Sequence, residues 1–191
     1  MERTPSPARQ SMTQPSIDRE TVWAQILEIY AVPGVQPACL LLQDRFCVDI
    51  MLLLFSLALG RCRRQPLDRS DIVEADRLIA HWRVTVVQPL RGVRKSLKDR
   101  VEPVPPSQSA SIREAIKRAE QSAEEIEFEV LAEHHANRSV LRAEHGWAEA
   151  AIETVVAYFA GNTVSSTAAE RAEAVAAIAY AAELTRTQDR V

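Results

Sequence analysis

The hydrophobic and polar positions of the chain are organised around one strongly apolar run at residues 50–59, in which Ser56 is the only polar residue. A helix with one solvent-exposed face would have polar residues recurring about every 3.6 residues, and this run shows no such pattern. The run is also about half the roughly 20 apolar residues that a helix needs to cross a membrane. We therefore expect a helix over residues 49–60 that other helices cover on all sides, with Asp49 as its N-terminal cap and Gly60 at its C-terminal end.

The flanking sequence repeats apolar residues at helical spacing, which predicts helices over residues 16–30 and 36–46. A further helix should begin at Asp68 or Ser70. An apolar seam then follows at these positions: Ile79, Trp82, Val86, Leu90, Val93 and Leu97. Pro89 lies inside the seam, so we expect either a kink or the start of a new helix there.

Prolines concentrate at residues 101–110, where a helix interior could not hold them, so this segment is predicted to be a linker. Ser111 and Glu114 form a capping-box pattern that opens a helix extending to about His134. Thr167 begins a second pattern of this kind.

Further helices are predicted over residues 147–159 and 167–184, and the polar ends of the chain should be disordered or frayed. The predicted fold class is all-α, an orthogonal or irregular helical bundle around the central apolar helix. Its predicted parts are a disordered tail at 1–15, a bundle core at 16–100, a linker at 101–110, an acidic helical extension at 111–185 and a frayed tail at 186–191. The sequence leaves open whether the extension packs on the core or projects from it.

Charge is distributed unevenly along the chain, whose net charge is −3. The first 100 residues carry 15 Lys and Arg against 11 Asp and Glu, whereas the remaining residues carry 8 against 15. A mildly basic half and an acidic half would either attract each other or face different partners.

Four cations share one helical face because they follow the spacing i, i+3, i+4 and i+7: Arg91, Arg94, Lys95 and Lys98. Such a face is typical of a surface for phosphate or for an acidic partner. Two other interpretations stay open, a plainly solvated face and an internal contact with the acidic helix at residues 120–133. The isoelectric point of about 5.9 and the lack of aromatic residues among these cations make nucleic acid an improbable partner.

The chain has three cysteines, an odd number without a C-x-x-C pair, which suits reduced thiols in a cytoplasm. A small buried residue is a better interpretation of Cys39 than a catalytic thiol. Cys62 stands between Arg61 and Arg63, and cationic neighbours lower the pKa of a thiol and favour its reactivity. The interpretation we favour is nevertheless that Cys62 is exposed and has no functional role. The N-terminus has no apolar signal region, so we expect a cytoplasmic protein.

Three histidines lie near glutamates, but none has a Glu three residues before it, as the two-metal sites of helical bundles require: His134, His135 and His145. H-E-x-x-H is absent, and so are the glycine-rich loops that hold phosphates. We therefore expect neither a metal nor another cofactor. Asp44 and Asp49 would suit acid–base catalysis, but helix capping by Asp49 and pairing of Asp44 with Arg45 or another arginine is the interpretation we favour.

Three blocks of the chain share a pattern with known proteins. The first consists of Tyr30, Pro33, Gly34, Val35, Ala38, Cys39, Leu40, Leu42, Gln43, Asp44, Asp49 and residues 52–55. The second consists of Trp82, Val86, Val87, Pro89, Leu90, Arg91, Val93 and Arg94, and the third of Arg113, Glu114, Lys117 and Glu120. Together they cover about residues 20–130 and resemble an uncharacterised family of small helical bacterial proteins, the domain of unknown function 2390.

That resemblance implies a helical bacterial protein and supplies no activity, cofactor or catalytic residue. The family pattern has Gly where Cys47 stands and Asn where Met51 stands. These departures weaken any site built on the start of the central helix.

We interpret the sequence as that of a non-enzymatic protein–protein interaction or regulatory module. Its predicted surface comprises Arg91, Arg94, Lys95, Lys98, Glu120, Glu124 and Glu127. The alternative is a small-molecule-binding or enzymatic bundle with a pocket formed by Trp23, Tyr30, Cys39, Gln43, Asp44, Asp49 and Trp82. A weaker third idea is redox sensing by Cys62.

Overall fold

Helices make up nearly all of the regular structure in the computed structural model, which confirms the all-α fold class. The described residues are 18–63, 66–98, 102–135, 146–160 and 168–184. The α-helices are α1 (Arg19–Ala31), α2 (Val35–Phe46), α3 (Ile50–Arg63), α4 (Arg69–Trp82), α5 (Gln88–Ser96), α6 (Pro106–His135), α7 (Trp147–Ala160) and α8 (Ala168–Leu184). A π-helical turn, η1 (Arg83–Val87), joins α4 to α5.

Helix α3 lies at the centre of the core, as its apolar composition predicted. Every residue from 52 to 59 is buried, and Leu52, Leu53 and Leu57 are 0% exposed. Among the described helices, none is by itself both long and apolar enough to cross a membrane. Helices α1 and α2 meet those criteria only as a pair, and that pair bends by 94°.

The prediction that Gly60 ends the central helix is wrong, because α3 continues to Arg63. The indole of Trp147, at the start of α7, packs directly on Gly60. A Cβ atom at this position would lie 2.1 Å from Trp147 Cζ3. Gly60 therefore permits a close helix contact and does not act as a helix terminator.

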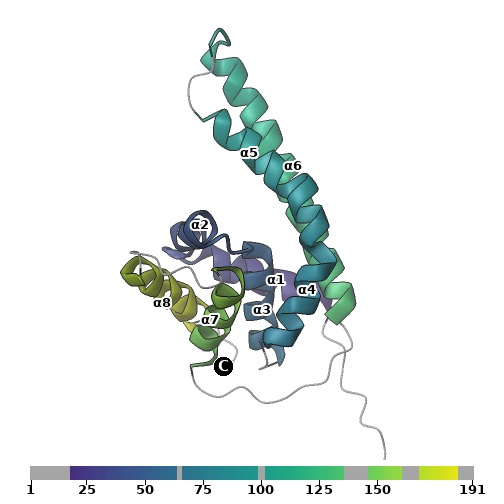
Figure 1. The fold of residues 1–191 in the computed structure, drawn as a ribbon, viewed down its shortest axis with the longest axis vertical. Coiled ribbons are helices and arrows are strands. Elements are labelled where there is room, and N and C mark those ends of the chain that lie inside the picture. The colour runs from purple at the N-terminus through teal and green to yellow at the C-terminus, as the bar shows by residue number, and fades with distance from the viewer. Residues whose placement is uncertain (1–17, 64–65, 99–101, 136–145, 161–167, 185–191) are drawn as a thin grey trace, which may run out of the picture.

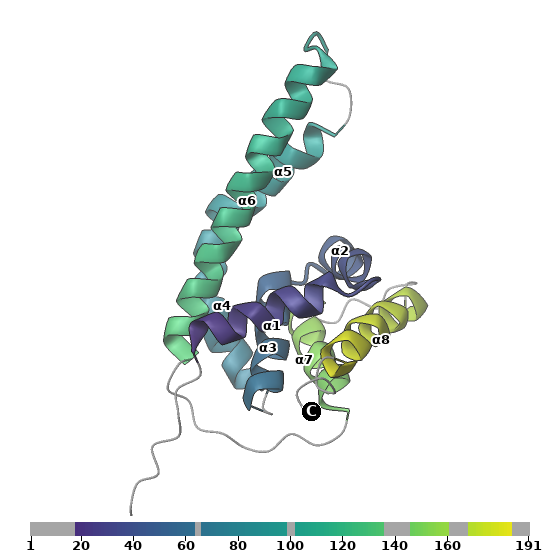
Figure 2. The same ribbon diagram turned by 180° about the vertical axis from the view of Figure 1, so that it is seen from behind.

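Helices α7 and α8 pack on the same core as the first three helices, so this described part of the predicted extension at 111–185 packs on the core. Helix α8 lies along α2, and α7 packs against α3 (Figures 1 and 2). Their inward residues Ile152, Val155 and Ile178 are 0% exposed and belong to one cluster with the α3 leucines. The alternation of small and branched apolar residues in these helices allows that close packing.

A pair of antiparallel helices projects from this globular part (Figure 1). Helices α4 and α5, joined by η1, run outward along one side, and α6 returns along the other. We call α5 together with residues 106–125 of α6 the arm, and the rest of the described helices the body. The predicted interruption at Pro89 takes the form of η1, where Gln88 N–H donates to Arg83 O, five residues earlier.

The predicted linker is shorter than residues 101–110, because α6 already begins at Pro106. Proline is tolerated in the first turn of a helix, where its missing N–H has no partner to lose. Ser111 and Glu114 consequently lie inside α6, and their predicted role as a capping box is wrong. The predictions for the two chain ends and for Thr167 lie outside the described residues.

Side-chain caps fix the starts of α3 and α4. Asp49 Oδ1 accepts a hydrogen bond of 2.8 Å from Leu52 N, which confirms its predicted capping role. Asp68 Oδ1 accepts one of 2.8 Å from Asp71 N, so Asp68 caps α4. Ser56, the polar exception in the apolar run, accepts a hydrogen bond of 3.1 Å from Leu67 N and ties the α3–α4 connection to the core.

Candidate binding pocket between the arm and the body

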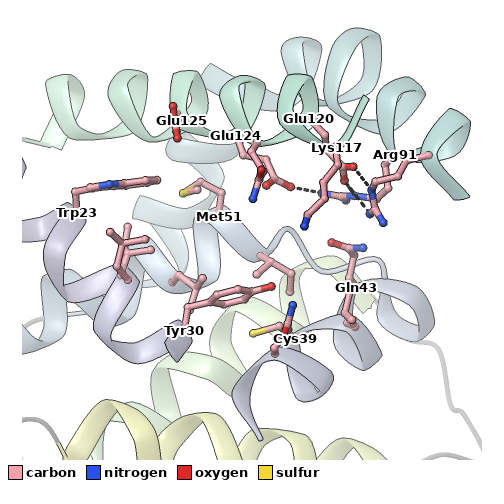
Figure 3. Close-up of a pocket in the computed structure, with 18 residues that line it drawn as sticks. Trp23, Tyr30, Cys39, Gln43, Met51, Arg91, Lys117, Glu120, Glu124 and Glu125 are labelled. Carbon is pink, nitrogen blue, oxygen red and sulfur yellow. Dashed lines mark hydrogen bonds and ion pairs between the residues drawn. The ribbon is translucent and has the colours of Figure 1, made fainter. Parts of the chain in front are cut away.

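A pocket of about 410 Å³ opens between the arm and the first three helices (Figure 3). Its floor is apolar and includes Ile26, Cys39 and Leu54, all of them buried. Helix α1 supplies one wall through Trp23 and Tyr30, and α5 and α6 supply the opposite wall. The pocket thus has an apolar base with polar groups above it, as small-ligand sites commonly do.

Arginines of α5 fix the position of the α6 wall. Arg91 Nε donates to Glu120 Oε1 over 2.8 Å, and Arg91 Nη2 donates to Glu124 Oε1 over 2.6 Å. Arg94 also donates to both carboxylate oxygens of Glu120. Burial disfavours the charged form of Glu120, but the hydrogen bonds from Arg94 and Arg91 outweigh it, so its pKa is lowered.

A second set of α6 side chains lines the pocket without such partners. Lys117, Gln121 and Glu125 follow one another at i, i+4 and i+8, and therefore lie along one flank of the helix. Within the described residues, neither Lys117 nor Glu125 makes an ion pair. Lys117 extends toward the body where Gln43 and Tyr30 lie, whereas Glu125 lies nearest Trp23 (Figure 3).

The structure brings part of the predicted pocket together. Trp23, Tyr30, Cys39 and Gln43 line it. Asp44, Asp49 and Trp82 do not line it, and each has a partner elsewhere in the fold. Lys95 Nζ donates to Asp44 Oδ1 over 2.6 Å, Arg83 Nη1 donates to Asp49 Oδ2 over 3.1 Å, and Trp82 Nε1 donates to Ala123 O over 3.0 Å.

The predicted basic stripe is mostly occupied by contacts within the chain. Arg91 and Arg94 pair with α6, and Lys95 pairs with Asp44 of α2, while Lys98 is exposed. Of the three interpretations that the sequence left open, the structure therefore favours the internal contact with the acidic helix for Arg91 and Arg94, which join α5 to α6 within the arm. Lys95 instead links the arm to α2 of the body.

Glu120 and Glu127, predicted as part of an interaction surface, are 4% and 2% exposed. Burial, and then the nearby charges of Asp49 and Glu124, raise the pKa of Glu127 to about 9. Glu127 is therefore a neutral carboxylic acid at pH 7, within the contact between α6 and the body. Its Oε1 atom has no hydrogen-bond partner among the described residues.

Arg83, whose charge lies near Glu127, is a residue that no sequence pattern singled out. Its guanidinium is bound by Asp49, the cap of α3, and by Asp76 of α4, whose Oδ1 lies 2.6 Å from Arg83 Nη2. Tyr158 of α7 donates to Asp76 Oδ2 over 2.7 Å, so three helices of the body meet at this cluster. The sequence signal that pointed toward this cluster was the predicted capping role of Asp49. Its Oδ1 caps α3, which leaves Oδ2 to bind a cation.

The cysteines differ in their surroundings in the described part of the chain. Burial raises the pKa of the Cys39 thiol to about 12, so it is a protonated thiol at the pocket floor. Cys62, expected to be exposed, is half-buried against the core. No three His, Cys, Asp or Glu side chains of the described residues are arranged to hold a metal ion.

The fold and the pocket define the class of the molecule, an all-α protein with a mixed apolar and charged pocket beside a projecting helical arm. The chain belongs to the family described as "Protein of unknown function (DUF2390)", whose sequence model matches residues 21–131. This confirms the resemblance seen in the sequence. No curated protein and no solved structure matches the chain.

Proposed function

We propose that this protein is a non-enzymatic binding module whose ligand occupies the pocket between the arm and the body. One observation carries the proposal: a charged group without an ion-pair partner lies above an apolar floor. Lys117 of α6 makes no ion pair among the described residues and extends across the pocket toward Gln43 (Figure 3). A ligand that carries an anionic group would form a charge-assisted hydrogen bond with this ammonium group.

The lining supports binding more than catalysis. Cys39 is the thiol among the lining residues, and its raised pKa keeps it in the protonated, unreactive form. The pocket carboxylates Glu120 and Glu124 are held by arginines and stabilise the wall. The predicted regulatory role fits a site of this kind, because a ligand between arm and body would contact both.

Anilinonaphthalene sulfonate is a suitable first probe, because it combines an aromatic body with one negative charge. We expect saturable fluorescence enhancement with the folded protein. Gln121→Trp places an indole at the pocket mouth and should weaken probe binding about tenfold or more. Ser122→Trp is the matched control, since Ser122 is the adjacent exposed residue of α6 and does not line the pocket.

Equal loss in both tryptophan variants, or no loss in either, would reject the pocket as the binding site. Circular dichroism of each variant excludes unfolding as the cause, because loosened helical proteins also bind this dye.

A second function, protein–protein interaction through the arm, is favoured by another observation. Ile112 and Ile126 of α6 are 55% and 46% exposed, and Ala119 is exposed between them at the same seven-residue spacing. This apolar row lies on a different flank of α6 from Lys117 and Glu125, as the helical period requires. Exposed apolar rows of this kind are common at interfaces.

The corresponding test is cross-linking capture of a partner from the native cell by the full chain. Ile112→Ser with Ile126→Ser should abolish capture, whereas Val73→Ser with Leu78→Ser on α4 should retain it, since both control residues are 40% exposed. Capture that is indifferent to the α6 changes would exclude this surface.

A further inference from the structure

The two ends of the pocket present opposite charges. Lys117 and Glu125 are eight residues apart on α6, which places them roughly 12 Å apart along the helix axis at a rise of about 1.5 Å per residue. Arg91, Arg94, Glu120 and Glu124 also line the pocket, but they are paired with one another. Lys117 and Glu125 are therefore the lining charges, among the described residues, that remain available to a ligand.

The Glu125 end is suited to a cation. Trp23 lies at this end, half-buried, with its ring against that of Phe128 at a centroid distance of 4.7 Å (Figure 3). An ammonium group near an indole is attracted by the negative face of the ring. A carboxylate above the same position adds an ion-pair partner.

The Lys117 end is suited to an anion, because the Lys117 ammonium makes no ion pair among the described residues. It extends toward the part of the body where Tyr30 and Gln43 lie (Figure 3). The Tyr30 hydroxyl also lies at this end (Figure 3), and burial raises its pKa, so it keeps its proton. A carboxylate could accept from the Lys117 ammonium and from the Tyr30 hydroxyl.

An apolar floor connects these ends, and an extended peptide of four residues spans about 13–14 Å at roughly 3.3–3.6 Å per residue. Building on the proposed function, we infer that the ligand is a short apolar peptide with both termini uncapped. Its ammonium group lies beside Trp23 and Glu125, and its carboxylate lies beside Lys117 and Gln43. Its side chains contact Ile26 and Leu54.

Calorimetric titration of the full chain with the tetrapeptide Ala-Leu-Leu-Ala tests this inference. Acetylating the amine or amidating the carboxylate removes one terminal charge at a time. We expect each cap to weaken binding about three- to tenfold, as a partly desolvated ion pair would.

Variants of the pocket then assign each terminus to its end. In Glu125→Gln, acetylation of the peptide should cause no further loss of affinity, whereas amidation should still weaken binding. In Lys117→Gln, amidation should cause no further loss of affinity, whereas acetylation should still weaken binding. Glu133→Gln and Arg118→Gln are matched controls, because both residues are exposed on α6 outside the pocket and should keep both penalties.

The outcomes separate this inference from the proposed function. If only one cap matters, or if the capped peptides bind as well as the uncapped one, the two-ended ligand is wrong. If no tetrapeptide binds while Gln121→Trp still displaces the dye, the peptide inference fails and the pocket proposal stands. If Gln121→Trp leaves both dye and peptide binding unchanged, the pocket proposal itself fails.

Discussion

The body and the arm are held in place by different forces. Around α3 the body buries leucines on every side, and Leu52, Leu53 and Leu57 have no exposed surface. Within the arm, where α5 packs along α6, charged side chains pair instead, with Arg91 and Glu120 as the central pair. Apolar burial is non-directional and stabilises the fold as a whole, whereas hydrogen-bonded charges fix specific distances.

This difference explains how the pocket keeps its shape. Its floor belongs to the apolar body, and its α6 wall is positioned by arginines of α5. Changes in the body should therefore act mainly on stability. Changes at the arginines should act on stability and on the pocket together, and the predictions that follow are ordered by the size of the expected effect.

The largest effect is expected in the body. Leu53→Ala should lower the free energy of unfolding by about 2–5 kcal/mol, because the side chain is completely buried and leaves a cavity. Leu90→Ala on the half-buried face of α5 should cost about 1 kcal/mol. Urea denaturation measures both, and similar losses would remove the distinction between the two regions.

Arg91→Ala should destabilise the protein by about 2–3 kcal/mol, because it leaves the Glu124 carboxylate without its arginine and Glu120 with Arg94 alone in a partly buried contact. It should also weaken dye binding. Lys95→Ala, which breaks a half-exposed pair with Asp44, should cost less than about 1 kcal/mol and serves as the control. Intact dye binding in Arg91→Ala would show that this pair does not position the pocket wall.

Two glycines allow a matched comparison of body and arm. Gly60→Ala should cost about 1–3 kcal/mol, because the new Cβ would overlap the Trp147 ring. Gly92→Ala on α5 should instead stabilise by about 0.5–1 kcal/mol, since nothing lies within 4 Å and alanine favours the helix. Thermal denaturation of the two variants should shift the midpoint in opposite directions, and a shift in the same direction contradicts this account.

Glu127 should make the stability depend on pH. Its pKa is raised from 4.5 to about 9 by burial and neighbouring carboxylates, so the folded state holds a proton that the unfolded state releases in this range. The contribution is complete below about pH 4.5 and is lost as the pH rises through about 9. Glu127→Gln cannot titrate, so its free energy of unfolding, measured by denaturation at a series of pH values, should fall less steeply between these two pH values. An unchanged dependence on pH would show that the pKa of Glu127 is not raised in the folded protein.

The smallest effect concerns Cys47, which ends α2 with φ of 56°, a left-handed conformation that glycine adopts readily. Cys47→Gly should stabilise by about 1 kcal/mol, whereas Cys47→Ala retains the Cβ and should not. Equal melting midpoints for the two variants would show that the backbone conformation carries no cost.

The sequence predicted the fold where one kind of interaction dominated. The uninterrupted apolar run required a covered α3, and the Asp49 carboxylate required a free helix start, so both predictions are confirmed. The role of Gly60 in α3 could not be predicted, because it packs against Trp147, which is distant in sequence.

The site was harder to foresee for the same reason. Trp23, Tyr30 and Gln43 come from neighbouring segments, and their convergence followed from helix packing. The opposite wall depends on which acidic residues of α6 are captured by α5, and periodicity alone did not distinguish the paired Glu120 from the available Glu125.

The pocket itself is the central claim, and the side-chain indole signals of the three tryptophans test it most directly. Trp23 lines the pocket, Trp82 donates to Ala123 within the helix pair, and Trp147 lies in the core. In a nitrogen–proton NMR titration with anilinonaphthalene sulfonate, we predict a saturable shift of the Trp23 indole signal, with the other two unchanged. A Trp23 signal that stays in place while the dye binds, or an equal shift at Trp147, would contradict the account.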